Sequence, residues 1–396
     1  MQNNPINRLA SVLLATLASL TIGHLQAVEF KPFGTSVLVI DLHGFASQGF
    51  IASNKYNYLG DSTHGSFKFS EAGLNLSFHP FPRTRVTAQV FTYDVGEAGQ
   101  YDVLLDCALA EYTFNDHLGI RAGRIRRPEG IYNDIQDVDL ARTFVLLPQG
   151  VYDARWRDFA VSLDGAEIFG TIPLKRAGSL SYELYAGTLN LSENGGVALQ
   201  IRDSLPGFVH LDGISPAKVY GGQLWWNTPV NGLRFGAACG YVPVFNFTTT
   251  IQTPGGSIHP DNRTSALSQH YSAEYLWNAW TFQAEFYLTD GEPIGAGTVE
   301  THSSSWYASA AYRFNKRFEL GGYYTESYRD THDRENSLKY QKDTALSLRF
   351  DASDAWIFKV EGHYLRGTGL LQDNANNPLQ QDDGWWMVAA KATFSF

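Results

Sequence analysis

Residues Trp385 to Phe396 of this 396-residue chain read WWMVAAKATFSF. Every second residue counted back from Phe396 is apolar as far as Trp386, whereas the alternate positions include Thr393 and Lys391. Successive side chains of a β-strand point to opposite faces, so this period of two predicts a strand with one apolar and one mixed face. The chain stops on an aromatic residue without a further turn, as we expect of a last strand that pairs with the first in a closed membrane barrel.

The first 27 residues have the composition of a secretory signal. Residues 1–8 are polar with one cation, Arg8, residues 9–23 form an almost unbroken apolar run, and Ala27 is a small residue suited to cleavage. The run is shorter than the ~20 residues that a transmembrane helix needs, although an N-terminal anchor helix is the alternative. We predict a signal peptide at 1–27 and one exported domain at 28–396.

The composition of the exported part suits a barrel. The mean hydropathy is -0.22, but barrels escape detection by hydropathy because only alternate residues face lipid. The chain has 37 Gly, 25 Phe, 21 Tyr and 9 Trp, residue types that barrel strands and membrane interfaces use. Loss of residues 1–27 removes Arg8 from the 30 cations, which leaves 29 against 40 acids and a formal charge of -11. This charge argues against nucleic acid as a partner.

The alternation of apolar and polar residues recurs along the whole exported part. We predict sixteen strands, at 35–46, 67–78, 84–93, 103–113, 118–126, 157–166, 179–189, 218–227, 232–242, 267–277, 280–289, 304–314, 317–326, 343–350, 356–365 and 385–396.

The connections between these strands alternate in length. Short turns lie near Pro80, Asn115, Pro229, Asn278, Asn315 and Asp351. Long loops lie at 47–65, 128–156, 190–217, 243–265, 290–303, 327–342 and 366–382, and the turn at 167–178 is longer than the pattern requires. Short turns at one end and long loops at the other are typical of outer-membrane barrels. We predict an all-β, up-and-down transmembrane barrel, with a soluble β-sandwich as the alternative; sixteen strands leave a water-filled channel.

The third long loop is the most charged part of the chain. Residues 121–158 read RAGRIRRPEGIYNDIQDVDLARTFVLLPQGVYDARWRD. Residues 144–147, FVLL, are too apolar to lie exposed in an outer loop and should pack against a wall.

At this point the chain resembles the sixteen-stranded porins of Gram-negative bacteria, and especially porin-like proteins that share stretches such as LHGFASQGF, RAGRIRRPEGIYN and VLLPQGVYD. In that family the loop after the fifth strand folds into the lumen, and an aromatic-ending last strand, here Phe394 and Phe396, serves as the assembly signal. The resemblance implies an outer-membrane channel for passive diffusion of small hydrophilic solutes and ions. It also implies a homotrimer, with outer-membrane lipid, lipopolysaccharide and the barrel assembly machinery as partners, and neither cofactor nor catalysis.

By analogy with that family, acids on the loop would face bases on the wall and set a transverse field across the constriction. The loop candidates are Glu129, Asp134, Asp137 and Asp139, and the wall candidates on the inward parity are Arg85, Arg121, Arg349, Lys359 and Lys391. The alternative is that these acids and bases pair with one another and only hold the loop in place.

Other chemistry has little support in the sequence. The eleven histidines form no HExxH motif, no GxSxG motif occurs, and the segment 137–139 matches only a fragment of a calcium loop. An outer-membrane lipase or protease, using pairs such as His43 with Asp41 or His363 with Glu361, is one alternative function, and a non-conducting structural or adhesion barrel is another. Cys107 and Cys239 lie in strands far apart in order, so we expect two unpaired thiols.

Overall fold

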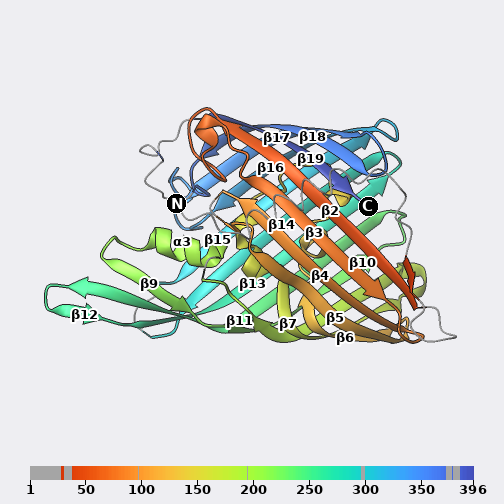
Figure 1. The fold of residues 1–396 in the computed structure, drawn as a ribbon, viewed down its shortest axis with the longest axis horizontal. Coiled ribbons are helices and arrows are strands. Elements are labelled where there is room, and N and C mark those ends of the chain that lie inside the picture. Colours follow the sequence, from red (N-terminus) through yellow and green to blue (C-terminus); the bar gives the residue numbers. More distant parts are fainter. Residues whose placement is uncertain are drawn as a thin grey trace.

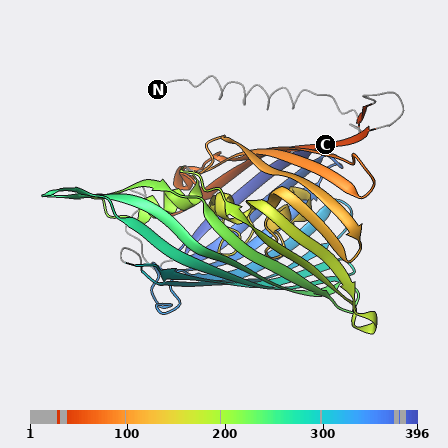
Figure 2. The same ribbon diagram turned by 90° about the horizontal axis from the view of Figure 1, so that it is seen from below.

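Sixteen antiparallel strands form a closed wall, as the sequence predicts (Figure 1 and Figure 2). The computed structural model describes residues 28–30, 38–96, 98–193, 195–295, 299–371, 377 and 384–396, so the signal peptide predicted at 1–27 lies outside the described residues. The strands of the wall are β2 (Leu38–Ser53), β3 (Phe69–Phe78), β4 (Thr84–Val95), β5 (Val103–Asn115), β6 (Leu118–Arg126), β7 (Ser162–Pro173), β8 (Ser179–Leu189), β10 (Ala217–Asn227), β11 (Leu233–Thr253), β13 (Asp261–Trp277), β14 (Trp280–Pro293), β15 (Thr301–Arg313), β16 (Phe318–Tyr328), β17 (Tyr340–Asp351), β18 (Trp356–Gly367) and β19 (Trp385–Ser395).

The barrel closes where β19 pairs with β2, from Met387 opposite Ser53 to Ser395 opposite Phe45. The predicted partner segment, 35–46, was placed too early: the paired residues are 45–53, because β2 runs on into the segment expected to be a loop. Beyond the strand, the backbone of Phe396 exchanges two hydrogen bonds with Gly44.

The two faces of β19 differ as the alternation predicts. Lys391 and Thr393 are buried inside the barrel, whereas Trp386 and Val388 are more than half exposed on the outer face. Phe394 lies on the outer parity, and its ring packs beside that of Trp356, with the ring centres 5.1 Å apart. A lipid-facing surface accepts such apolar side chains and a charge does not, so the period of two fixes the direction of each residue.

Three shorter strands add to the wall. β1 (Val28–Phe30) pairs with β2, and β9 (Val209–Ile214) and β12 (Gly256–Ile258) pair with the distal part of β11. β9 and β12 form with β11 a ribbon that projects beyond the barrel at the end of the long loops (Figure 1). The loop predicted at 243–265 is therefore mostly strand.

The sixth strand begins later than predicted. Residues expected to start it form a short helix, α2 (Arg157–Ala160), after the 3-10 turn η4 (Ala154–Trp156), whose N-terminus is capped by the Asp153 side chain. β7 begins only at Ser162 and continues to Pro173. The long turn predicted at 167–178 is thus a short one, built on the 3-10 turn η5 (Lys175–Ala177).

A β-bulge alters the direction of Cys107. Gln89 pairs with Cys107 but Val90 pairs with Leu105, so Asp106 is the extra residue of β5. Asp106 and Cys107 are both buried, whereas strict alternation would put Cys107 on the same face as Leu105, which is exposed. Both cysteines are free thiols, as predicted. The remaining helix, α3 (Gly196–Ser204), lies at the end of the long loops, and no helix in the described part of the chain is long and apolar enough to cross a membrane.

The segment between β6 and β7, residues 127–161, folds inside the barrel (Figure 2); we call it the inner loop. It includes the 3-10 turns η2 (Asn133–Ile135) and η3 (Asp139–Ala141). Its apolar stretch, residues 144–147, is at most 3% exposed, which confirms that it packs on a wall. Val145 and Leu146 join an apolar cluster with Phe69, Phe91 and Trp385 of the wall.

Candidate functional site

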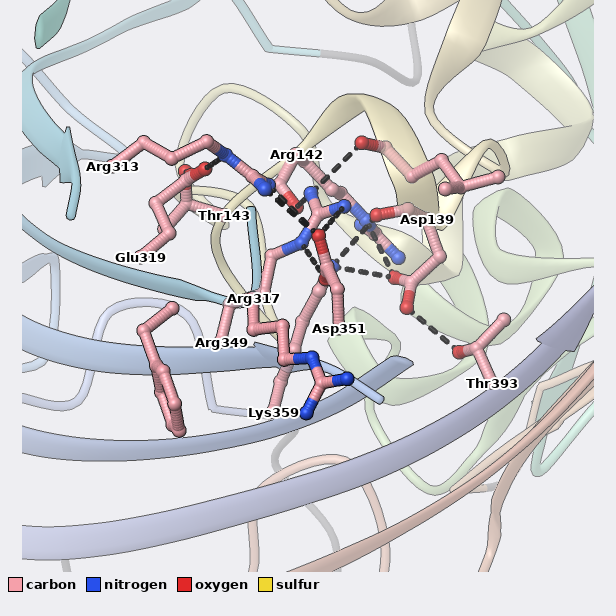
Figure 3. A network of polar contacts seen from close by, with 12 residues as sticks. Asp139, Arg142, Thr143, Arg313, Arg317, Glu319, Arg349, Asp351, Lys359 and Thr393 are labelled. Atoms are coloured by element: carbon pink, nitrogen blue, oxygen red, sulfur yellow. Dashed lines mark hydrogen bonds and ion pairs between the residues drawn. The ribbon is translucent and has the colours of Figure 1, made fainter. Parts of the chain in front are cut away.

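The inner loop is attached to the wall around it at several places, and one of them is Asp139. Lys359 of β18 and Lys391 of β19 place their Nζ atoms 3.1 and 3.5 Å from Asp139 Oδ1. Arg142 of the loop itself lies 3.1 Å from the same oxygen, and Thr393 donates a hydrogen bond of 2.7 Å to Oδ2 (Figure 3). All five side chains are at least nine-tenths buried.

This attachment keeps Asp139 ionised. Burial raises the pKa of the Asp139 carboxyl, but the cations of Lys359, Lys391 and Arg142 outweigh burial and leave the pKa well below its usual range. Lys391 also lies 2.5 Å from Glu71 of β3. Three buried cations, Lys359, Lys391 and Arg142, therefore share the carboxylates of Asp139 and Glu71. Loss of one acid would leave a buried cation without a partner.

Wall side chains also hold the backbone of the inner loop. Glu361 of β18 accepts hydrogen bonds from the amides of Val145 and Leu146, at 2.8 and 3.1 Å. Arg349 of β17 donates to the carbonyls of Leu140 and Arg142, at 2.8 and 3.1 Å. A loop with little regular secondary structure needs such partners for its buried amides and carbonyls, and here inward-facing charges of the wall supply them.

A second attachment lies two residues earlier in the inner loop, at Asp137. Arg126 at the end of β6 binds both oxygens of Asp137, at 2.7 and 2.8 Å, and Gln89 of β4 donates at 2.5 Å. Arg126 and Arg157 also bind Asp106, each at 2.5 Å. Burial raises the pKa of Asp137, but Arg126 and Arg157 outweigh it and the pKa is lowered.

The first part of the inner loop, residues 127–131, is attached to β13 and β14. Glu129 pairs with Arg127 at 2.8 Å and accepts a hydrogen bond from Ser268 of β13 at 2.8 Å. The amide of Ile131 donates to Glu285 of β14 at 2.9 Å. Three of the four predicted loop acids are therefore buried in contacts that fasten the loop.

The five predicted wall bases divide into two groups. Lys359 and Lys391 meet Asp139 directly, and Arg349 meets loop carbonyls and Asp351, at 2.7 Å. Arg85 and Arg121 instead meet acids of the wall. The sequence did not predict these wall acids as partners, nor Arg142 and Glu361 as anchors. Inward parity was the one available signal for the wall residues, and Arg142, which lies in the loop, had none.

Arg121 of β6 is the centre of the second group. Its guanidinium lies 3.3 Å from Glu111 of β5, 3.5 Å from Glu167 of β7 and 4.0 Å from Glu183 of β8, and Arg85 of β4 lies 3.1 Å from Glu111. The side chains of Arg85, Glu183 and Arg121 are 43%, 25% and 18% exposed, although all point into the barrel. Water therefore reaches this part of the wall, which we call the open side; the β16–β19 wall around Asp139 is the pinned side.

The side chains that the inner loop itself exposes between Ile135 and Leu140 are apolar. From Asp137 to Leu140 the side chains alternate: Asp137 and Asp139 are buried against the wall, whereas Val138 and Leu140 are 41% and 47% exposed. Ile135 is 38% exposed. An apolar surface of this kind inside a polar barrel is unusual, because exposed apolar side chains normally mark a contact with something else.

Asp134 is the one predicted loop acid without a close cationic partner. Burial, reinforced by Glu183, raises the pKa of Asp134 to about 7, against the opposing effect of Arg126 and Arg121. Its Oδ1 atom accepts no hydrogen bond from the described residues. Asp134 therefore belongs electrostatically to the open side.

The two sides of the lumen support different chemistry. On the pinned side the charged side chains are buried and paired with one another. They can hold the loop, but they offer no unpaired group to a solute. The open side has four carboxylates, of Glu111, Asp134, Glu167 and Glu183, against the two guanidiniums of Arg85 and Arg121. Within the described ranges, no three His, Cys, Asp or Glu side chains are arranged to hold a metal ion.

The similarity of this chain to known proteins is found in its three-dimensional structure. No protein-family model and no curated protein sequence matches the chain. The anion-selective porin of Comamonas acidovorans matches with a TM-score of 0.55 at 11% identity, over 91% of this chain and 100% of that one. The outer membrane channel DcaP of Acinetobacter baumannii matches with a TM-score of 0.57 at 11% identity, over 94% and 100%.

A trimer form of the Vibrio cholerae outer membrane protein OmpT matches with a TM-score of 0.56, also at 11% identity, over 91% of this chain and 99% of that one. These matches span almost the entire chain on both sides, and identities this low show the fold alone. The fold of this chain is that of the sixteen-stranded barrels of outer-membrane porins and channels.

Proposed function

We propose that this protein is an outer-membrane porin, which lets small hydrophilic solutes and ions diffuse passively through a water-filled channel. The observation that carries the proposal is the asymmetric lumen: the inner loop is fastened to the pinned side, and partly exposed charged side chains line the open side. A barrel of this strand number leaves room for water, and charged groups along the remaining gap suit a path for hydrated solutes.

The predicted site residues have two roles in this proposal. Glu129, Asp137 and Asp139, with Arg349, Lys359 and Lys391, position the inner loop and so set the size of the channel. Asp134, with Arg85 and Arg121, lines the gap that remains. This division favours the alternative in which most of the loop acids pin the loop and do not set a transverse field.

The cellular setting is part of the proposal. The predicted signal peptide at 1–27 would direct export, Phe394 and Phe396 would serve the assembly machinery, and lipid and lipopolysaccharide would surround the barrel. Outer-membrane neighbours support this location, and the trimer form of the Vibrio protein supports a homotrimer.

The test is single-channel recording of the refolded full chain in planar bilayers, with reversal potentials in a salt gradient and swelling of liposomes in a panel of sugars and amino acids. We expect stepwise conductance, weak cation preference and passage of small solutes. A refolded protein that neither conducts ions in planar bilayers nor lets solutes swell liposomes would refute the porin function and favour a structural barrel. Esterase and protease assays on the same sample test the remaining alternative, and we expect no turnover in them.

A further inference from the structure

The open side contains more negative than positive charge in a small space. Arg121 is shared among three carboxylates at 3.3 to 4.0 Å, and no hydrogen bond forms between its guanidinium and any of them. Arg85 pairs with Glu111, whose Oε2 atom also faces Arg121. With Asp134 at the edge, four acids face two cations, so the gap favours an additional positive charge once these acids are ionised.

Two of these acids have acceptor atoms to spare. Glu167 is only 1% exposed, and neither of its carboxylate oxygens accepts a hydrogen bond from the described residues; its one cationic contact is Arg121 at 3.5 Å. Asp134 Oδ1 likewise accepts no hydrogen bond from the described residues. Buried acceptors normally have donors, because an unsatisfied one costs free energy. The gap therefore lacks hydrogen-bond donors as well as positive charge.

The loop residues that follow Asp134 expose apolar side chains. Ile135 follows Asp134 directly, and Val138 is exposed between the two buried acids Asp137 and Asp139. A hydrated inorganic cation would gain nothing from Ile135 and Val138. A solute that carries both a cationic donor group and an apolar body would be complementary to both parts of the gap.

We propose that the gap between the inner loop and the β5–β8 wall is a binding subsite for small organic cations, in which an ammonium or guanidinium group meets Glu167, Glu183 and Asp134 and an apolar body lies on Ile135 and Val138. The inference deepens the proposed function, since such a subsite would select among the solutes that diffuse through the channel. The pinned side offers no counterpart, because its acids already have buried cations.

Binding at this subsite should strengthen as pH rises from 6 to 8. The groups that face Asp134 are Glu183 of β8 and Arg121 and Arg126 of β6; the carboxyl group of Glu167 of β7 lies beside Arg121. Asp134 loses its proton with a pKa of about 7, and the deprotonated form attracts a cation more strongly. Arg126 stays paired with Asp137 throughout this range.

The first experiment measures binding without conduction, by calorimetry of the refolded full chain in detergent. The probe is benzylammonium, with methylammonium as the cation that lacks the ring and toluenesulfonate as the aromatic anion. We expect benzylammonium to bind more tightly than methylammonium by about tenfold, the effect of burying one apolar group, and toluenesulfonate not to bind. Equal affinity for both ammonium ions, or no saturable binding, would overturn the proposal.

Variants locate the subsite. Asp134→Asn with Glu183→Gln should weaken both ammonium probes by about tenfold or more, as expected for lost charge-assisted hydrogen bonds. Ile135→Ser should weaken benzylammonium alone. The control is Asp212→Asn on the projecting ribbon, whose side chain contacts Thr250. An equal loss in the control, or none in the double variant, would contradict the assignment.

Conductance then separates this inference from the proposed function. If the channel conducts, millimolar benzylammonium should reduce its current and the double variant should relieve the block. Conductance without any binding would leave the porin function standing and refute the subsite. Binding without conductance would leave the subsite standing and refute the porin function.

Discussion

On the pinned side of the lumen, Lys359 and Lys391 are buried around Asp139 at 3.1 and 3.5 Å, whereas on the open side Arg121 is spread over three glutamates and remains 18% exposed. Both sides are built from the same residue types on inward-facing strand positions. The inner loop makes the difference, because it brings Asp139 and backbone carbonyls to the charges of one wall, whereas on the other side it leaves Arg85 and Arg121 to acids of the wall. The same kind of charge therefore fixes structure on one side and remains available to a solute on the other.

The largest effect should follow from Asp139→Asn. The variant leaves Lys359, Lys391 and Arg142 buried around a neutral amide, and breaking a buried pair in this way costs about 3–5 kcal/mol. We expect a lower unfolding temperature and a noisier, larger single-channel conductance, because the inner loop loses its main attachment. Asp261→Asn, at an exposed position, is the control. Unchanged stability would mean that the pinned side does not hold the loop.

The next largest effect should follow from Glu361→Gln. The amide keeps one acceptor oxygen, so one of the bonds from Val145 and Leu146 is lost, at about 1–3 kcal/mol. The measurement is hydrogen exchange of these two amides, which should accelerate. Glu335→Gln, in the loop between β16 and β17, should leave both rates as they are; equal acceleration in that control would point to general loosening.

On the open side, Glu183→Gln should change selectivity and not stability. One charge at 4 Å in water contributes about 1 kcal/mol, so the cation-to-anion permeability ratio should fall by roughly fivefold or less. Reversal potentials in a salt gradient give the ratio, and thermal unfolding should be unchanged. A loss of stability without a shift in reversal potential would erase the distinction between the two sides.

The smallest effect is a pH dependence, and its sign differs between the sides. Asp134, with its pKa raised to about 7, binds its proton more tightly in the folded protein than in the unfolded chain, so its contribution to stability falls as pH rises from about 4 to 7. Over the same titration the open side gains negative charge, and cation preference should rise between pH 6 and 8. Asp134→Asn should abolish that rise.

Asp139 behaves in the opposite way. Its pKa is lowered, so its stabilising effect is complete above the usual aspartate pKa of about 4 and is lost only as pH falls below that value. Asp139 itself should therefore add no pH dependence to the unfolding temperature between pH 5 and 8. A carboxyl band of Asp139 that titrates within this range in infrared difference spectra would contradict this assignment.

The period of two was enough to predict the barrel. It gave sixteen strands, their inward and outward faces, and the inward direction of Arg85, Arg121, Arg349, Lys359 and Lys391, because a strand repeats every two residues whatever its partners are. It failed at the start of β7, where the Asp153 cap turns the chain into a helix, and at the bulge that carries Asp106 and Cys107 inward. Both depend on local geometry that alternation does not encode.

By itself the sequence determined that this chain forms a wall with polar and apolar faces, and a long charged loop whose apolar stretch must pack on a wall. The tertiary structure alone decided how the charges are shared. Asp139 and Lys391 are separated by most of the chain and meet only because the barrel closes and the inner loop crosses to that wall. Which acid becomes an anchor and which faces the lumen is thus set by contacts between distant segments, and Coulomb interactions become strong only where those contacts exclude water.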